Sequence, residues 1–157
     1  MTSTMDITVE DQPTTLVAVV RERVAMDALA AFYDRAYGLV VQEVTAAGLA
    51  ITGPAFGWYL DMPTDSVDLA AGFGVGAEAV GVLGGGVEVV ELPGGPAAVG
   101  VHVGTYDGLP GAWAELRTWF SGQAAQMRGD FLEVYVTDPS EVEPNQNETR
   151  LVLPIVP

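Results

Sequence analysis

Two stretches of this chain share one pattern, and this internal repeat constrains the fold more than any other feature. The segment GPAFGWYLDMP, residues 53–63, aligns without gaps with GDFLEVYVTDP, residues 129–139, and the glycine, the tyrosine and the proline coincide. Three identities at eleven positions also occur by chance among strand residues. The order of the surrounding elements, however, repeats as well, so we interpret the chain as one supersecondary unit used twice.

Hydrophobic periodicity gives the elements of each unit. Apolar residues at helical spacing predict a helix over about 28–47 and a second helix from about Pro110 through Phe120. β-branched and aromatic runs bounded by Gly, Pro and Asp predict strands. The expected strands are about 7–9, 14–24, 55–60, 67–75, 87–92, 97–103, 131–137 and 149–156.

The predicted fold class is therefore α+β. We expect two pseudo-symmetric βαββ modules, over about 7–77 and 86–157, within a single domain that spans residues 1–157. One module alone would leave a sheet face open. Two modules together predict a curved antiparallel sheet, with the helices on one face and a ligand cleft on the other.

A glutamate stands in the most apolar strand of the second repeat. Alternation places Leu132, Val134 and Val136 on one face, and that face suits a core. The other face carries Glu133 between Phe131 and Tyr135. Two interpretations are open: Glu133 lines a ligand cleft, or it is a solvated residue on an exposed sheet face.

The repeat gives Glu133 a counterpart without charge. Glu133 aligns with Gly57, and Tyr135 aligns with Tyr59. We expect Gly57 and Tyr59 to line the side of the cleft opposite Glu133. Strand parity then turns Trp58, with Phe56 and Leu60, against the helices.

Composition excludes several classes of function. The chain has 21 acidic residues against six basic ones, all arginine, and a formal net charge of −15. It lacks the basic surface that neutralises phosphates, so no direct contact with nucleic acid is expected. An acidic field favours cations, although an acidic surface can also serve solubility alone.

Further absences narrow the chemistry. The sequence has no cysteine and one histidine, so we expect no disulfide, no metal site and no cofactor. His102 lies in an apolar strand and is interpreted as a hydrogen-bonded structural residue. No apolar run is long enough to span a membrane, and no signal pattern opens the chain. A cytoplasmic protein is expected.

Several stretches resemble one known family. They are VVELPGG at 89–95 with its following strand, GTYDGL at 104–109 with Trp113 and Trp119, and FLEVY at 131–135 followed by Asp138 and Pro139. In this order and spacing they resemble the GyrI-like domain, the effector-binding domain of AraC-type and multidrug-responsive regulators, here in a stand-alone form. The first half fits more loosely, through 16–20 and 59–63.

The resemblance implies a fold of two βαββ modules with a cleft for amphipathic, often cationic aromatic small molecules. Glu133 matches the glutamate of that cleft. With Phe131, Tyr135, Gly57 and Tyr59 as further lining, and Tyr106 and Trp113 as walls, the expected function is multidrug binding for sequestration or sensing in drug tolerance. A lipophilic cation would pair with the carboxylate while aromatic rings supply area and cation–π attraction.

Two other functions stay open. Some members of the family hydrolyse cyclopropane-bearing DNA alkylators, and Glu133 would then act as the acid or base. The sequence shows no recognised catalytic pair, so no catalytic residue is assigned otherwise. A protein partner, reached through an acidic surface that mimics DNA, is the weaker alternative.

Overall fold

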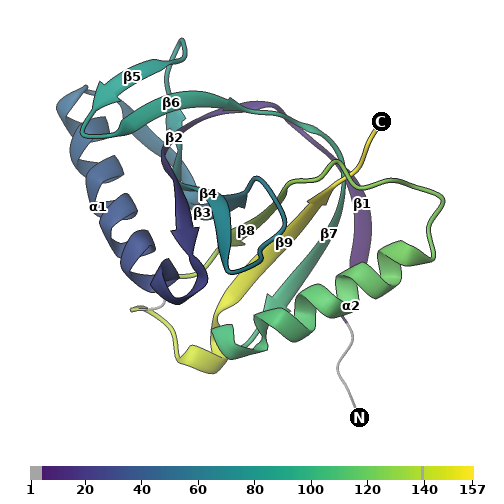
Figure 1. Cartoon of the computed structure of the whole chain (residues 1–157). Coiled ribbons are helices and arrows are strands. Elements are labelled where there is room, and N and C mark those ends of the chain that lie inside the picture. The colour runs from purple at the N-terminus through teal and green to yellow at the C-terminus, as the bar shows by residue number, and fades with distance from the viewer. Residues whose placement is uncertain (1–4, 139) are drawn as a thin grey trace. The chain divides into compact units, whose positions relative to one another are not determined.

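The computed structural model describes residues 5–138 and 140–157 (Figure 1). The first four residues lie outside this range, as does Pro139, the closing proline of the repeat. The chain divides into two compact units. We call Pro13–Gly94 the α1 unit, and Met1–Gln12 with Gly95–Pro157 the α2 unit.

The α1 unit holds one helix and five strands. In chain order these are β2 (Thr15–Ala25), the 3-10 turn η1 (Met26–Ala28), α1 (Leu29–Ala46), β3 (Ala50–Tyr59), β4 (Ser66–Gly76), β5 (Gly81–Gly84) and β6 (Val87–Leu92). The strands pair antiparallel in the order β3-β4-β2-β6-β5.

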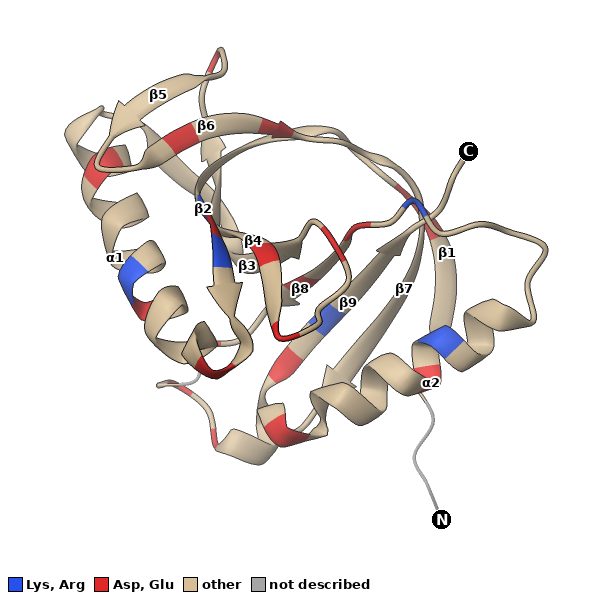
Figure 2. Cartoon of the chain, viewed as in Figure 1, with Lys and Arg blue, Asp and Glu red and all other residues tan. Residues whose placement is uncertain are grey.

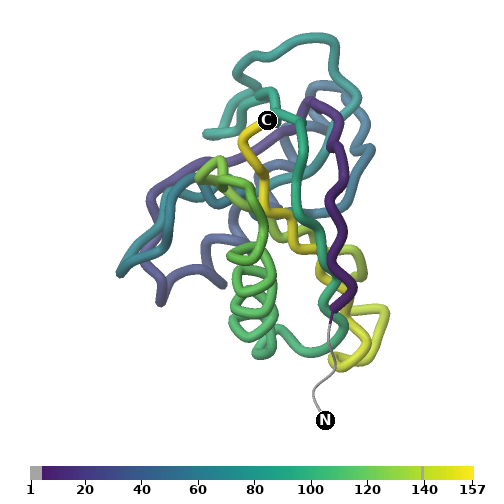
Figure 3. The backbone as a smooth tube through the Cα atoms, turned by 90° about the vertical axis from the view of Figure 1, so that its right-hand side faces the viewer, coloured from purple at the N-terminus to yellow at the C-terminus, as the bar shows by residue number. Residues whose placement is uncertain are grey.

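The described residues of the α2 unit form one helix and four strands. These are β1 (Ile7–Gln12), β7 (Gly95–Val103), η2 (Tyr106–Gly108), α2 (Leu109–Ser121), β8 (Phe131–Tyr135), η3 (Pro144–Gln146) and β9 (Glu148–Pro154). Their antiparallel order is β1-β7-β9-β8. The N-terminal strand β1, purple in Figure 3, runs beside the teal strand β7.

The predicted α+β class and the repeated module are confirmed. The succession β2-η1-α1-β3-β4 recurs as β7-η2-α2-β8-β9. The pairing repeats too, because β3-β4-β2 corresponds to β8-β9-β7. Each unit has a further strand beside its repeated module. In the α2 unit β1 pairs with β7, and in the α1 unit β6 pairs with β2.

Helix α1 shows why the pattern folds in this way. Its four buried residues, Phe32, Ala36, Val40 and Val44, recur every four positions and form one stripe. Strand β2 packs against the helix, and its residues Val17, Ala18, Val19 and Val20 are all buried. Gly48 follows the helix with φ 71°, a left-handed conformation that glycine adopts without strain.

In the α2 unit the core differs from prediction in two details. Helix α2 buries Leu109, Ala112, Trp113, Leu116 and Phe120, while Trp119, expected in the core, is half-buried. Strand β8 ends at Tyr135, so Val136 lies beyond it and is 47% exposed rather than in the core. No helix of the described residues is long and apolar enough to cross a membrane.

Candidate functional site

Glu133 is buried in the α2 unit and is held by two side-chain donors. Its residue exposure is 8%, which rules out the solvated interpretation. Trp113 Nε1 donates to Oε2 over 2.7 Å, and the Tyr135 hydroxyl donates to Oε1 over 2.7 Å. Each carboxylate oxygen therefore has a fixed direction, because both donors belong to packed elements.

The elements explain this placement. Alternation along β8 puts Phe131, Glu133 and Tyr135 on one face, as predicted. Trp113 belongs to the buried stripe of α2. Since its indole reaches Glu133, the glutamate lies on the sheet face that α2 covers. The prediction had placed the helices on the opposite face, because parity separates the two faces but does not tell which one the helix packs on.

Aromatic rings surround the carboxylate. Trp113 and Phe131 meet edge to face, with centroids 4.9 Å apart and an interplanar angle of 68°. The rings of Tyr106 and Tyr135 also meet edge to face, with centroids 5.9 Å apart and an interplanar angle of 69°. The structure thus brings Phe131, Trp113, Tyr135 and Tyr106 together around Glu133.

Tyr106 is the exposed member of this group. It lies in η2 and is 40% exposed. Burial of part of the ring raises the pKa of its phenol, and the nearby negative charge of Asp138 adds to the effect. The phenol therefore stays neutral, and able to donate a hydrogen bond, above its ordinary range.

Sequence reasoning missed Arg117. Its guanidinium carbon lies 5.5 Å from the Trp113 ring centroid and 5.4 Å from that of Phe131. These are cation–π distances. The signal was present, because a residue four positions after Trp113 on a helix lies on the same side.

Gly57 and Tyr59 lie in the α1 unit, beneath its helix. The hydroxyls of Tyr33 and Tyr59 share a hydrogen bond of 2.7 Å. A Cβ on Gly57 would collide with the Tyr33 hydroxyl. Gly57 and Tyr59 thus face α1, whereas the prediction had turned Trp58 and its neighbours toward the helix. The cleft that Gly57 and Tyr59 would share with Glu133 stays a prediction.

Tyr37 completes this second cluster. Its ring stacks on that of Tyr33, with centroids 5.6 Å apart and an interplanar angle of 28°. Its hydroxyl donates a hydrogen bond of 3.0 Å to the Phe56 carbonyl. At position 57, the counterpart of Glu133 in the repeat, the space that a side chain would take is filled by the Tyr33 hydroxyl from α1.

The remaining polar candidates have structural roles. His102 Nε2 lies 3.0 Å from the Thr105 carbonyl, which agrees with the predicted hydrogen-bonded histidine. Within the described ranges, no three His, Asp or Glu side chains are grouped to hold a metal ion. Figure 2 shows acidic residues on helices and strands of both units.

Comparison with known proteins decides the family. Residues 5–156 match the family model of the GyrI-like small molecule binding domain. The chain belongs to the GyrI-like family. It is therefore a GyrI-like small-molecule-binding domain, and the resemblance drawn from the sequence is confirmed. No curated protein matches the chain.

Solved structures agree with the fold of this GyrI-like domain. The C-terminal domain of EcmrR is 20% identical with TM-score 0.79, over 97% of this chain and 98% of that one. In the EcmrR–DNA complex the identity is 21% and the TM-score 0.82, and the match spans 96% of this chain but only 57% of the EcmrR chain.

Two more distant structures carry functional descriptions of their own. SAV2435, solved bound to tetraphenylphosphonium, is 14% identical with TM-score 0.70, over 97% of this chain and 94% of that one. A hydrolase from Listeria innocua is 14% identical with TM-score 0.68, over 98% and 93%. At such identities these similarities establish the fold alone.

Proposed function

We propose that this GyrI-like protein binds amphipathic, cationic aromatic compounds at Glu133. The observation that carries the proposal is a buried carboxylate fixed by Trp113 and Tyr135. The indole and phenol donors orient the two carboxylate oxygens. A lipophilic cation would be attracted to this carboxylate more strongly in a dry site than in water.

The surrounding rings favour a flat ligand. Phe131, Trp113, Tyr135 and Tyr106 offer aromatic faces and edges, which bind ring systems with little demand on shape. Gly57 and Tyr59 are proposed as further lining. The structure of SAV2435 with tetraphenylphosphonium supports the idea that this fold can accept a bulky aromatic cation.

Titration with tetraphenylphosphonium, followed by tryptophan fluorescence, tests the proposal. Wild type should show saturable binding. Glu133→Gln should weaken it by about tenfold or more, the effect of losing one charged contact. Glu141→Gln, an exposed glutamate, removes the same charge and should leave the affinity unchanged. Absence of saturable binding would refute the function, and binding that survives Glu133→Gln would remove Glu133 from the site.

The proposed physiological role is sequestration or sensing in drug tolerance. The net charge of −15 supports a role without direct DNA contact. Cells that express the wild-type protein should tolerate a toxic cationic dye better than cells that express Glu133→Gln. Equal growth would argue against sequestration.

Hydrolysis is a second candidate, favoured by one contact. The Tyr135 hydroxyl donates to Glu133 over 2.7 Å, so a carboxylate that can accept a proton from water lies beside a phenol that can donate one. Incubation with a cyclopropane-bearing alkylator should then yield a product heavier by one water. Product formation should be lost in both Glu133→Gln and Tyr135→Phe. Unchanged substrate with the wild-type protein excludes this activity.

A further inference from the structure

Arg117 differs from the other arginines of this chain. Among the described residues, five of the six arginines form ion pairs with carboxylates, and Arg117 forms none. The exception is notable in a chain with 21 acidic residues. The paired arginines are Arg21, Arg23, Arg35, Arg128 and Arg150.

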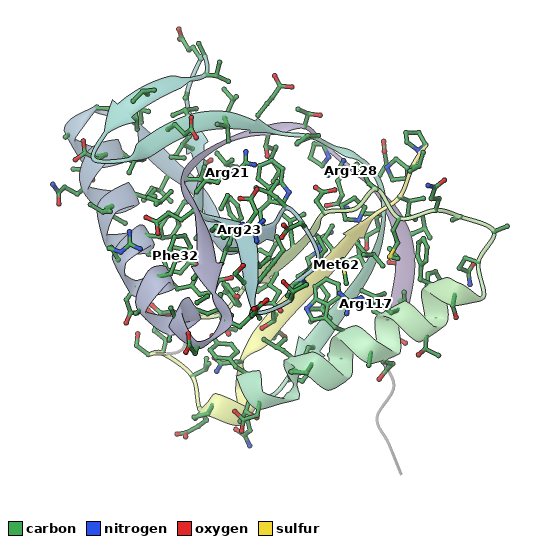
Figure 4. All side chains as sticks on the ribbon, in the orientation of Figure 1. Arg21, Arg23, Phe32, Met62, Arg117 and Arg128 are labelled. Carbon is green, nitrogen blue, oxygen red and sulfur yellow. The ribbon has the colours of Figure 1, made fainter. Side chains whose placement is uncertain are left out.

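Aromatic rings hold Arg117 instead. Its guanidinium lies over Trp113 and Phe131 at 5.5 and 5.4 Å, one helical turn after Trp113. Figure 4 labels its side chain beside α2, against the strands of the same unit. Stacking occupies the faces of the guanidinium and not its edge, where all its N–H groups point.

One of those N–H groups has no acceptor. Over the described residues, two buried side-chain atoms lack a hydrogen-bond partner: Arg117 Nε and Thr149 Oγ1. Thr149 is fully buried in β9 and pairs in register with Tyr135, so it shares the face of Glu133. Both unmet atoms therefore belong to the layer between α2 and its sheet. Buried donors are normally satisfied, and a ligand with an acceptor would satisfy Arg117 Nε.

The indole of Trp113 connects the two charges. Its N–H bonds to Glu133, while its face carries Arg117. We infer that the ligand is amphoteric: a cationic group meets Glu133, and an acceptor, most simply a carboxylate, meets Arg117. This inference rests on the proposed function and names the class of compound that the site selects.

The same geometry makes a ligand that carries only positive charge bind less tightly than an amphoteric one. Arg117 already presents a cation to Trp113 and Phe131, and a second cation at those rings meets like-charge repulsion. A carboxylate on the ligand turns that repulsion into attraction and forms a charge-assisted hydrogen bond.

Rhodamine B and its ethyl ester test the inference, because they share one cationic ring system and differ in the free carboxylate. Wild type should bind rhodamine B about tenfold or more tightly than the ester, the effect of one charge-assisted hydrogen bond. Arg117→Met keeps a long apolar stem but removes the guanidinium, and it should abolish the preference. Arg35→Met causes the same change in net charge at an exposed ion pair and should retain it.

The outcomes separate the two proposals. Equal affinity of wild type for both dyes, or a preference that survives Arg117→Met, overturns the inference and leaves the proposed function intact. Absence of binding to either dye overturns both. Arg117→Gln provides the same comparison if Arg117→Met does not fold, since the amide carries no charge.

Discussion

Trp113 and Glu133 join helix α2 to strand β8 through one hydrogen bond of 2.7 Å. A buried bond from a neutral donor to a carboxylate combines two roles, since it fixes the helix over the sheet and orients an acceptor. A variant that keeps an aromatic ring at position 113 but removes the donor tests these roles.

Trp113→Phe should lower the free energy of unfolding by about 1–3 kcal/mol, because Glu133 loses a donor inside the protein. Urea denaturation measures the change. Trp119→Phe is the control on the same helix, and it should have a smaller effect because Trp119 is half-buried. The double variant Trp113→Phe with Glu133→Leu should lose less unfolding free energy than the two single variants lose in sum. Additive losses would mean that the bond does not couple the two residues.

Gly57→Ala should destabilise the α1 unit by about 1–3 kcal/mol, because the added methyl group displaces the Tyr33 hydroxyl from Tyr59. Tyr33→Phe removes that hydroxyl, so the alanine should be less harmful in its presence. Thermal unfolding of the single and double variants measures both effects. Gly38→Ala is the matched control: open space surrounds this position in α1, and alanine should stabilise the helix by up to about 1 kcal/mol.

Asp61 makes a pH-dependent contribution to the free energy of unfolding. The Asp68 backbone N–H, and then the Arg23 guanidinium, hold the pKa of Asp61 below its ordinary 3.8. The folded state thus binds this proton less readily than the unfolded state. The stabilisation is fully present above pH 3.8 and is lost as the pH falls through the lower folded pKa.

The stability difference between wild type and Asp61→Asn should therefore be constant near neutral pH and shrink below pH 3.8. Denaturant titrations at a series of pH values measure it. Arg23→Gln removes the guanidinium but leaves the Asp68 backbone hydrogen bond, so it should reduce the pH dependence without abolishing it. A difference that grows on acidification would contradict the assignment.

A substitution at Val82 tests whether the edge strand of the α1 unit pairs with other molecules. It lies on the edge strand β5 and is 81% exposed. Val82→Lys should change the free energy of unfolding by no more than about 0.5 kcal/mol. It should also reduce self-association, because a charge on an edge strand opposes pairing between molecules. Light scattering measures association. Val87→Lys, at a fully buried position of β6, should prevent stable folding.

Helix α1 and strand β2 could be predicted because their signals are local. The four-residue spacing of α1 and the β-branched run of β2 each indicate one element without reference to distant residues. The pairing of β1 with β7 could not be predicted, since strand partners are chosen by packing between segments far apart in sequence.

The site was predictable to a similar degree. The position of Glu133 between two aromatic residues, together with the family resemblance, indicated a buried carboxylate. Its donor from α2 depends on which sheet face the helix covers, and parity leaves that open. Arg117 was missed because an arginine on a helix is usually solvated, and only the tertiary structure places it over Trp113 and Phe131.

Positions 57 and 133 are equivalent in the repeat, and each is contacted by an aromatic residue from the helix of its own unit. One module has a glycine at this position, which admits the Tyr33 side chain, and the other has a glutamate, which accepts a hydrogen bond from Trp113. Each unit retains its own buried core, so a change at either position does not have to be matched at the other. Under the proposed function, a mutation at position 57 or at position 133 would change the ligand contacts of one unit and leave the core of the other unit unchanged.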